Sequence, residues 1–357
     1  MKSNKRVELD DLVRDIGNIG YKDLAPTILC YTTDRRIGKY CLQKGHKFRY
    51  GMQVRILPEQ DLKYNDIDFD SLISKKYGEA LLKFSEVMLT KLYYANLTNF
   101  YNNLNEIKID TKDSKEMRDL FYNRQLGYYS AKDNEIVLNE DYASITIFHE
   151  LFHMASSVYL NGIYYVGFKQ YLSSSYESIG QGLNEGYTQL LTERYFGHCF
   201  DMKSPYKYES FVASKLEKIV GKYNMQELYL NANLYGLIKN LRTYASYEEI
   251  IEFISNLDYI SANLNKKVNI ILKSDMLAKK IKLINRFLVK TYLVKLKRDV
   301  VGGALSNDEM IVKLSQYVYS LVNDFHISDF SYCKISEDGI RDDMENMLTL
   351  VNGGKKK

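Results

Sequence analysis

Two histidines four residues apart, His149 and His153, constrain the fold of this chain more than any other feature of its sequence. They lie in the run Ile147 to Met154, which has the pattern of a helix. In an α-helix, residues at i and i+4 lie one above the other, so both imidazoles can turn a nitrogen toward one ion. Neutral imidazole is a good zinc ligand. We therefore expect one zinc ion per chain and a second element that supplies a third protein ligand.

Glu150 directly follows the first histidine, where its carboxylate can reach a water molecule beside the ion and take its proton. This position predicts a general base and not a ligand. The helix face expected to meet a core is formed by the apolar residues Phe148, Leu151, Ala155 and Val158. Both histidines lie off that face. The alternative is that they are ordinary histidines of a packed helix.

The second element is predicted over residues 182–197, where leucines and a tyrosine recur at helical spacing and Gly197 is a suitable stop. Glu185 in its first turn is the expected third ligand. Glu193 lies eight residues later, roughly 12 Å further along the axis, so both cannot meet one ion. Glu177 lies in a Ser- and Gly-rich stretch, where a carboxylate is hard to hold in place. Beside Glu185, Gly186 would let this helix approach the first one closely.

Several other side chains are candidates for supporting the site. Residues 159–182 are rich in Gly, Ser and Tyr, which predicts a mobile rim between the two helices. A tyrosine hydroxyl of this rim can stabilise a developing oxyanion, and the candidates are Tyr164, Tyr165, Tyr171 and Tyr176. His198 is a poor candidate, since it lies roughly 20 Å along the helix axis from Glu185. The expected supporting residues on the second helix are Asn184, Thr188 and Gln189.

The pattern His149-Glu150-x-x-His153, followed by Asn184-Glu185 within Gly-Leu-Asn-Glu-Gly-x-Thr, resembles the gluzincin metallopeptidases, which include the thermolysin-like enzymes. The resemblance covers about residues 134–197. It implies a zincin-like core in which His149, His153 and Glu185 hold zinc, Glu150 activates water, and a peptide or protein substrate is cleaved. Gln189 stands where the thermolysin-like pattern has Asp, and 31 residues separate His153 from Glu185, a longer gap than in that pattern. The resemblance therefore extends to the broad group and to no closer member.

The rest of the chain predicts an α+β fold in three regions: a mixed region 1–103, a zincin-like catalytic core 104–205, and a helical region 206–357. A long helix is expected over Ser71–Tyr101. A short strand is expected over Leu104–Asp110, then a hairpin of Gln125–Tyr129 with Asn134–Leu138. The hairpin leads into the histidine helix. That helix is expected to start near Asn139 to Asp141, where an Asn or Asp side chain can cap its first turn. Beyond Tyr206 the absence of proline and the helical spacing predict a bundle.

Charge and cysteine content exclude few partners. The chain has 357 residues, with 49 basic and 45 acidic side chains, too even a balance to indicate nucleic acid or a membrane. Two basic segments, 35–55 and 276–298, are most simply solvated surfaces, the second being the lysine face of a packed helix. The four cysteines show no regular spacing, and Cys30, Cys41 and His46 fit no compact metal knuckle.

The sequence shows no secretory signal and no transmembrane span, so we expect a soluble, cytoplasmic protein; its oligomeric state is left open. The expected function is a zinc-dependent metallopeptidase. Two alternatives remain open. One is a catalytically silent metallopeptidase-like module that binds a partner through basic surfaces, and the other is a zinc hydrolase with a non-peptide substrate.

Overall fold

The computed structural model describes residues 67, 69–120, 126–160, 163–171, 178–197, 206–264 and 270–324. The basic segment 35–55, the possible Cys30–Cys41–His46 cluster and the C-terminal lysines lie outside these residues. The chain divides into two compact units, one of residues 1–167 with 226–232 and one of residues 168–225 with 233–357. The predicted region boundaries at 103/104 and 205/206 stay predictions.

The α+β class predicted from the sequence is confirmed, with helices predominating over two small sheets in the described residues. In the first unit, β3 (Glu135–Asn139) is the central strand of a three-stranded sheet. It pairs parallel to β1 (Lys108–Lys112) and antiparallel to β2 (Gly127–Ser130), with Gly127 opposite Leu138. The predicted hairpin is therefore confirmed. Ile136, Val137 and Leu138 are fully buried, which explains the apolar run.

Two predictions in the N-terminal part of this unit are wrong in detail. The single helix expected over Ser71–Tyr101 is three helices, α4 (Phe69–Ser74), α5 (Gly78–Lys91) and α6 (Thr98–Leu104). The chain breaks before α5 because Tyr77 has a left-handed backbone, φ 62°. The Asn96 side chain accepts a hydrogen bond from the N–H of Thr98, the first residue of α6, and so favours the start of a new helix there. Since α6 runs to Leu104, the following strand begins later than expected, at Lys108.

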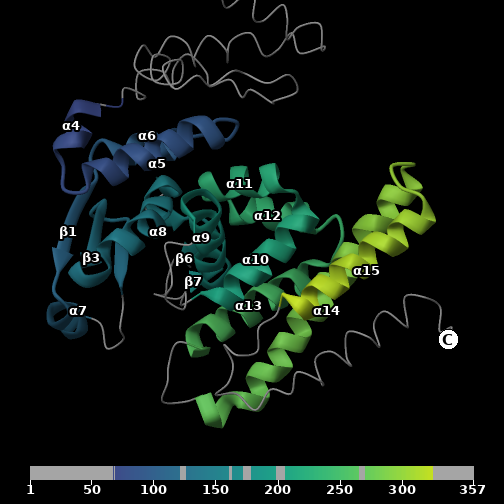
Figure 1. Ribbon diagram of the computed structural model, residues 1–357. Coiled ribbons are helices and arrows are strands. Elements are labelled where there is room, and N and C mark those ends of the chain that lie inside the picture. The colour runs from purple at the N-terminus through teal and green to yellow at the C-terminus, as the bar shows by residue number, and fades with distance from the viewer. Residues whose placement is uncertain are drawn as a thin grey trace, which may run out of the picture. The chain divides into compact units, whose positions relative to one another are not determined.

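The histidine helix follows directly from the central strand. A short 3-10 turn, η3 (Glu140–Tyr142), leads into α8 (Ala143–Ala155), and the Asn139 side chain accepts from Asp141 N–H as predicted. Helix α8 packs against β2, β3, α5 and α6 (Figure 1). The Phe152 and Phe84 rings meet edge-on with centroids 4.9 Å apart. This packing fixes α8 along its length and holds the predicted ligands His149 and His153 on a rigid element.

The rim predicted over residues 159–182 has regular structure in its described parts, which form strands apart from a turn at residues 167–168 and a helix that begins at residue 181; its mobility stays a prediction. In the first unit, β4 (Ser157–Leu160) pairs antiparallel to β5 (Ile163–Val166), placing Tyr159 opposite Tyr164. In the second unit, β6 (Lys169–Tyr171) pairs antiparallel to β7 (Ser178–Ile179). Tyrosine and β-branched residues pack well on a pleated surface, and here that preference outweighs the glycines and serines.

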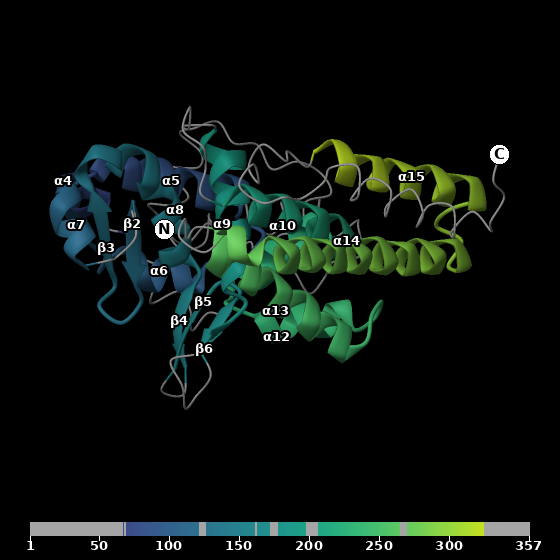
Figure 2. The same ribbon diagram turned by 90° about the horizontal axis from the view of Figure 1, so that it is seen from below.

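The second unit is a helical assembly, as predicted for the residues beyond Tyr206. Helix α9 (Gln181–Phe196) ends before Gly197, whose φ of 78° confirms the predicted stop. Helix α9 packs against α10 (Lys207–Val220) and α13 (Tyr247–Leu264), and α14 (Ile270–Val301) packs between α13 and α15 (Asn307–Asn323) (Figure 2). Of the remaining described helices, α12 (Leu234–Leu241) is in the second unit, α7 (Ser114–Leu120) is in the first, and α11 (Lys222–Leu230) has residues in both.

The basic helix predicted over residues 276–298 lies within α14 and is packed in the helical assembly. Its apolar stripe is buried, at Leu277, Ile281, Ile284 and Leu288. Lys279, Lys290 and Lys297 are exposed, in agreement with a solvated lysine face. Among the described helices, none combines the length and apolar character needed to cross a membrane.

Candidate metal centre

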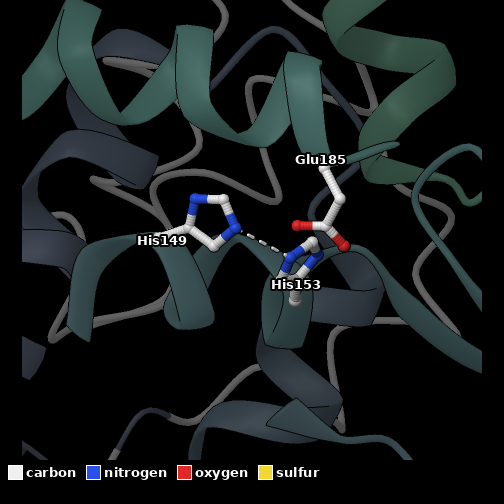
Figure 3. Close-up of side chains that lie close together, drawn as sticks. All are labelled: His149, His153 and Glu185. Atoms are coloured by element: carbon white, nitrogen blue, oxygen red, sulfur yellow. Dashed lines mark hydrogen bonds between the residues drawn. The ribbon is translucent and has the colours of Figure 1, made fainter. Parts of the chain in front are cut away.

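Helix α8 brings the two predicted histidine ligands together on one face. The Nε2 atoms of His149 and His153 lie 3.1 Å apart, and both side chains are buried, with 6% and 7% of their surface exposed (Figure 3). Two nitrogens bound tetrahedrally to one zinc at 2.0–2.1 Å would lie roughly 3.3 Å apart. The spacing of the imidazole nitrogens therefore suits a shared ion.

Glu185 joins this pair from α9. It is 8% exposed, and its carboxylate and the two imidazoles offer ligand atoms that all lie within 4.8 Å of one another. In Figure 3 the Glu185 side chain extends from its helix toward the His153 ring. Two imidazoles and one carboxylate are the protein ligands of many catalytic zinc sites, which keep the fourth position for water or substrate. These three buried residues could hold a metal ion.

Glu150 lies on α8 next to His149 and is 5% exposed. It is outside the group of three converging ligands that the described residues form. Its place directly after His149 is the one from which a carboxylate could act on water at this site without holding the ion. Its role as the base stays a prediction.

Gln181 contacts the predicted third ligand, Glu185, and was not predicted from the sequence. Its side-chain Nε2 donates to Glu185 Oε1 at 2.5 Å, one helical turn along α9. A hydrogen bond to one carboxylate oxygen restricts the orientation of the other, which is how neighbouring groups tune metal ligands. The i, i+4 spacing of Gln181 and Glu185 is the signal that would have found this pair.

The predicted supporting residues of α9 make contacts within the second unit. Asn184 Oδ1 accepts from the Phe168 backbone N–H at 3.1 Å, which ties α9 to the start of β6. Thr188 Oγ1 donates to the Asn184 carbonyl at 2.7 Å. Gln189 Nε2 donates to Glu193 Oε1 at 2.9 Å. Asn184 therefore anchors the helix that carries Glu185, and the supporting role expected of Gln189 at the site stays a prediction.

The tyrosine candidates lie on strands. Tyr164 and Tyr165 are on β5, where the Tyr164 ring packs on Tyr159 with centroids 4.5 Å apart. Tyr171 is on β6, with Lys169 Nζ 4.7 Å from its ring centroid. Tyr176 lies outside the described residues, as do the rejected candidates Glu177 and His198. The choice of an oxyanion donor among these tyrosines stays a prediction.

The expectation that Gly186 brings α9 close to α8 is wrong. Gly186 gives close approach to α10 instead of α8, since a Cβ there would lie 2.3 Å from the carbonyl carbon and oxygen of Glu209. Near the other end of α9, Arg194 makes a bidentate pair with Glu217 of α10, at 2.8 and 2.6 Å. Both contacts are with α10. The spacing of residues within α9 cannot indicate which other helix packs against it.

Glu209 of α10, also not predicted from the sequence, is a buried carboxyl group whose backbone lies against Gly186 of α9. Burial is the main cause that raises its pKa to about 7; its own backbone N–H and Ser261 lower the pKa, and the Glu185 charge raises it. A carboxyl group with this pKa carries a proton for much of the time near neutral pH. It therefore adds less negative charge beside Glu185 than an exposed glutamate would.

Comparison with known proteins gives no match: no protein-family model, no curated protein and no solved structure matches the chain.

Proposed function

We propose that this protein is a zinc-dependent peptidase of the gluzincin type. The observation that carries the proposal is the convergence of His149, His153 and Glu185, three buried residues from two helices with ligand atoms within 4.8 Å of one another. The donor types fit zinc, since imidazole nitrogen and carboxylate oxygen are its usual ligands at catalytic sites. The resemblance of residues 134–197 to gluzincins adds support for peptide hydrolysis as the reaction.

Each residue has a distinct role in the proposed reaction. His149, His153 and Glu185 would hold the ion, which when bound lowers the pKa of water and polarises the scissile carbonyl. The Glu150 carboxylate would accept a proton from the attacking water as its oxygen bonds to the carbonyl carbon. When the C–N bond breaks, Glu150 would pass that proton to the leaving amine. Water is thereby divided between the new carboxyl and amino ends.

The test compares wild type with Glu150→Gln, which has the same size but cannot accept a proton. Each zinc-loaded protein is incubated with a peptide library, and new amino termini are identified by mass spectrometry. We expect cleavage by wild type and a loss of roughly 100- to 10,000-fold in the variant, with zinc content unchanged. Equal cleavage by both proteins would contradict the proposal. Absence of peptide products, with zinc bound, would instead favour a non-peptide substrate or a binding module.

A further inference from the structure

The amino end of α9 is capped by a residue from another helix. Asp258 of α13 accepts hydrogen bonds from the Gly180 N–H through Oδ2, at 2.8 Å, and from the Gly182 N–H through Oδ1, at 2.7 Å. The first N–H groups of a helix have no partner within the helix. Both oxygens of one carboxylate therefore satisfy donors at the start of the helix that carries Glu185.

Helix α9 has no cap from its own sequence. Gly180 occupies the N-cap position with φ 85° and has no side chain to accept a hydrogen bond. A negative charge at this end also interacts favourably with the helix dipole. Asp258, 78 residues further along the chain than Gly180, supplies both the acceptors and the charge.

Close backbone packing holds the capped end in one place. A Cβ at Gly182 would lie 2.7 Å from the Leu257 carbonyl oxygen, and a Cβ at Gly180 would lie 2.1 Å from that of Phe168. The two glycines therefore allow backbone contacts that other residues would prevent. With the carboxylate bonds in place, the first turn of α9 has little freedom to shift or rotate relative to α13.

Glu185 lies immediately after this capped turn. It is three residues beyond Gly182, and Gln181, between the two capped glycines, donates to its carboxylate. A small rotation of the first turn would move both the ligand and the residue that orients it. Metal sites require ligands held within about 0.5 Å.

We propose that Asp258 is a positioning residue for the metal ligand Glu185, acting through the first turn of α9. This inference rests on the proposed function, because it requires that Glu185 bind zinc. Asp258 itself does not touch the ion. Its effect is expected on the affinity of the site, and only while Glu185 is present as the ligand.

The experiment is a double-mutant cycle on zinc affinity, measured by competition with a chelator of known affinity. Asp258→Ala removes both acceptors, whereas Asp258→Asn keeps the side-chain volume and one acceptor oxygen. We expect Asp258→Ala to weaken zinc binding about tenfold, in the range seen for supporting residues of metal sites, and Asp258→Asn to weaken it less. In a Glu185→Ala background the same substitutions should cause no further loss.

Asp324→Asn is the matched control. Asp324 Oδ2 accepts from the buried Lys215 Nζ at 2.5 Å in the same unit, so its loss should destabilise that unit without affecting the α9 cap. Zinc affinity of this control should equal that of wild type. If Asp258→Ala does not fold, the Asp258→Asn arm of the cycle decides the question.

Three outcomes would overturn the inference, and they differ in what else they affect. An equal loss of affinity with and without Glu185 would show that Asp258 acts through general stability. Unchanged affinity in both Asp258 variants, while Glu185→Ala weakens binding, would reject the role of Asp258 and leave the zinc site standing. A wild-type protein that binds no zinc would end both this inference and the proposed function.

Discussion

His149 and His153 lie close together because they are one turn apart on α8, so their spacing follows from helix geometry alone. Glu185 is different, since it lies on a second helix, with 31 residues between it and His153, and its approach to the imidazoles depends on how that helix is placed. At the residue scale, the third ligand is therefore the most informative position to test.

We expect Glu185→Ala to lower zinc affinity by at least about tenfold, and Glu193→Ala and Glu177→Ala to leave it near the wild-type value. Glu185 belongs to the converging group. Glu193 lies about two turns beyond Glu185 on α9, where it accepts a hydrogen bond from Gln189. Isothermal titration of each purified variant with zinc would measure the difference. A larger loss in Glu193→Ala or Glu177→Ala would show that another carboxylate holds the ion.

At the scale of elements, α9 is unusual in being buried on nearly all sides while carrying many polar residues. Several of its polar side chains have hydrogen-bond partners, such as Tyr187, which donates to the Glu217 carboxylate at 2.8 Å. Burial of a polar group is tolerated when its hydrogen bonds are made. The position of α9 is thus determined by its contacts with α10 and α13.

Gly186→Ala tests the contact with α10. The added methyl would lie 2.3 Å from the Glu209 backbone, which cannot move as a side chain can. We expect a destabilisation of about 3 kcal/mol, the upper part of the usual range for overpacking. The Tm, measured by circular dichroism, should fall by roughly 6–12 °C for a unit of this size.

Gly302→Ala is the control for that substitution, because the nearest atom to its added Cβ is the Arg298 carbonyl oxygen at 3.3 Å and the site is exposed. Its Tm should change by much less. If the two alanine variants have the same Tm, the close approach of α9 and α10 is not a constraint on the fold.

At the scale of the whole molecule, a shared ion would link α8 and α9, two helices that are separate in sequence. A ligand that binds only the folded state stabilises it, by about 2.7 kcal/mol when its free concentration is 100 times Kd. Zinc binding and unfolding are therefore expected to be coupled.

We expect zinc to raise the Tm of the wild-type protein by several degrees and a chelator to reverse the change. In a variant carrying both His149→Ala and His153→Ala, zinc should produce no comparable rise, because two of the three ligands are gone. Differential scanning calorimetry with and without zinc checks this. An equal rise in both proteins would place the stabilising ion elsewhere.

Local features of this chain could be read from its sequence because their causes are local. The His149–His153 spacing, the Asn139 cap and the stop at Gly197 each depend on a few neighbouring residues. The buried stripe of α14 also follows from helical periodicity. For the same reason Glu185 could be selected as a ligand from its place in the first turn of a predicted helix.

The surroundings of Glu185 depend on tertiary structure. Asp258 caps α9 from a position 78 residues away from Gly180, and Gly186 meets the backbone of Glu209 on α10. The segment expected to be a mobile rim forms strands because cross-strand partners such as Tyr159 and Tyr164 stabilise them. Such contacts join residues distant in sequence, and no local propensity specifies which distant residue will supply a cap, a partner strand or a packing surface.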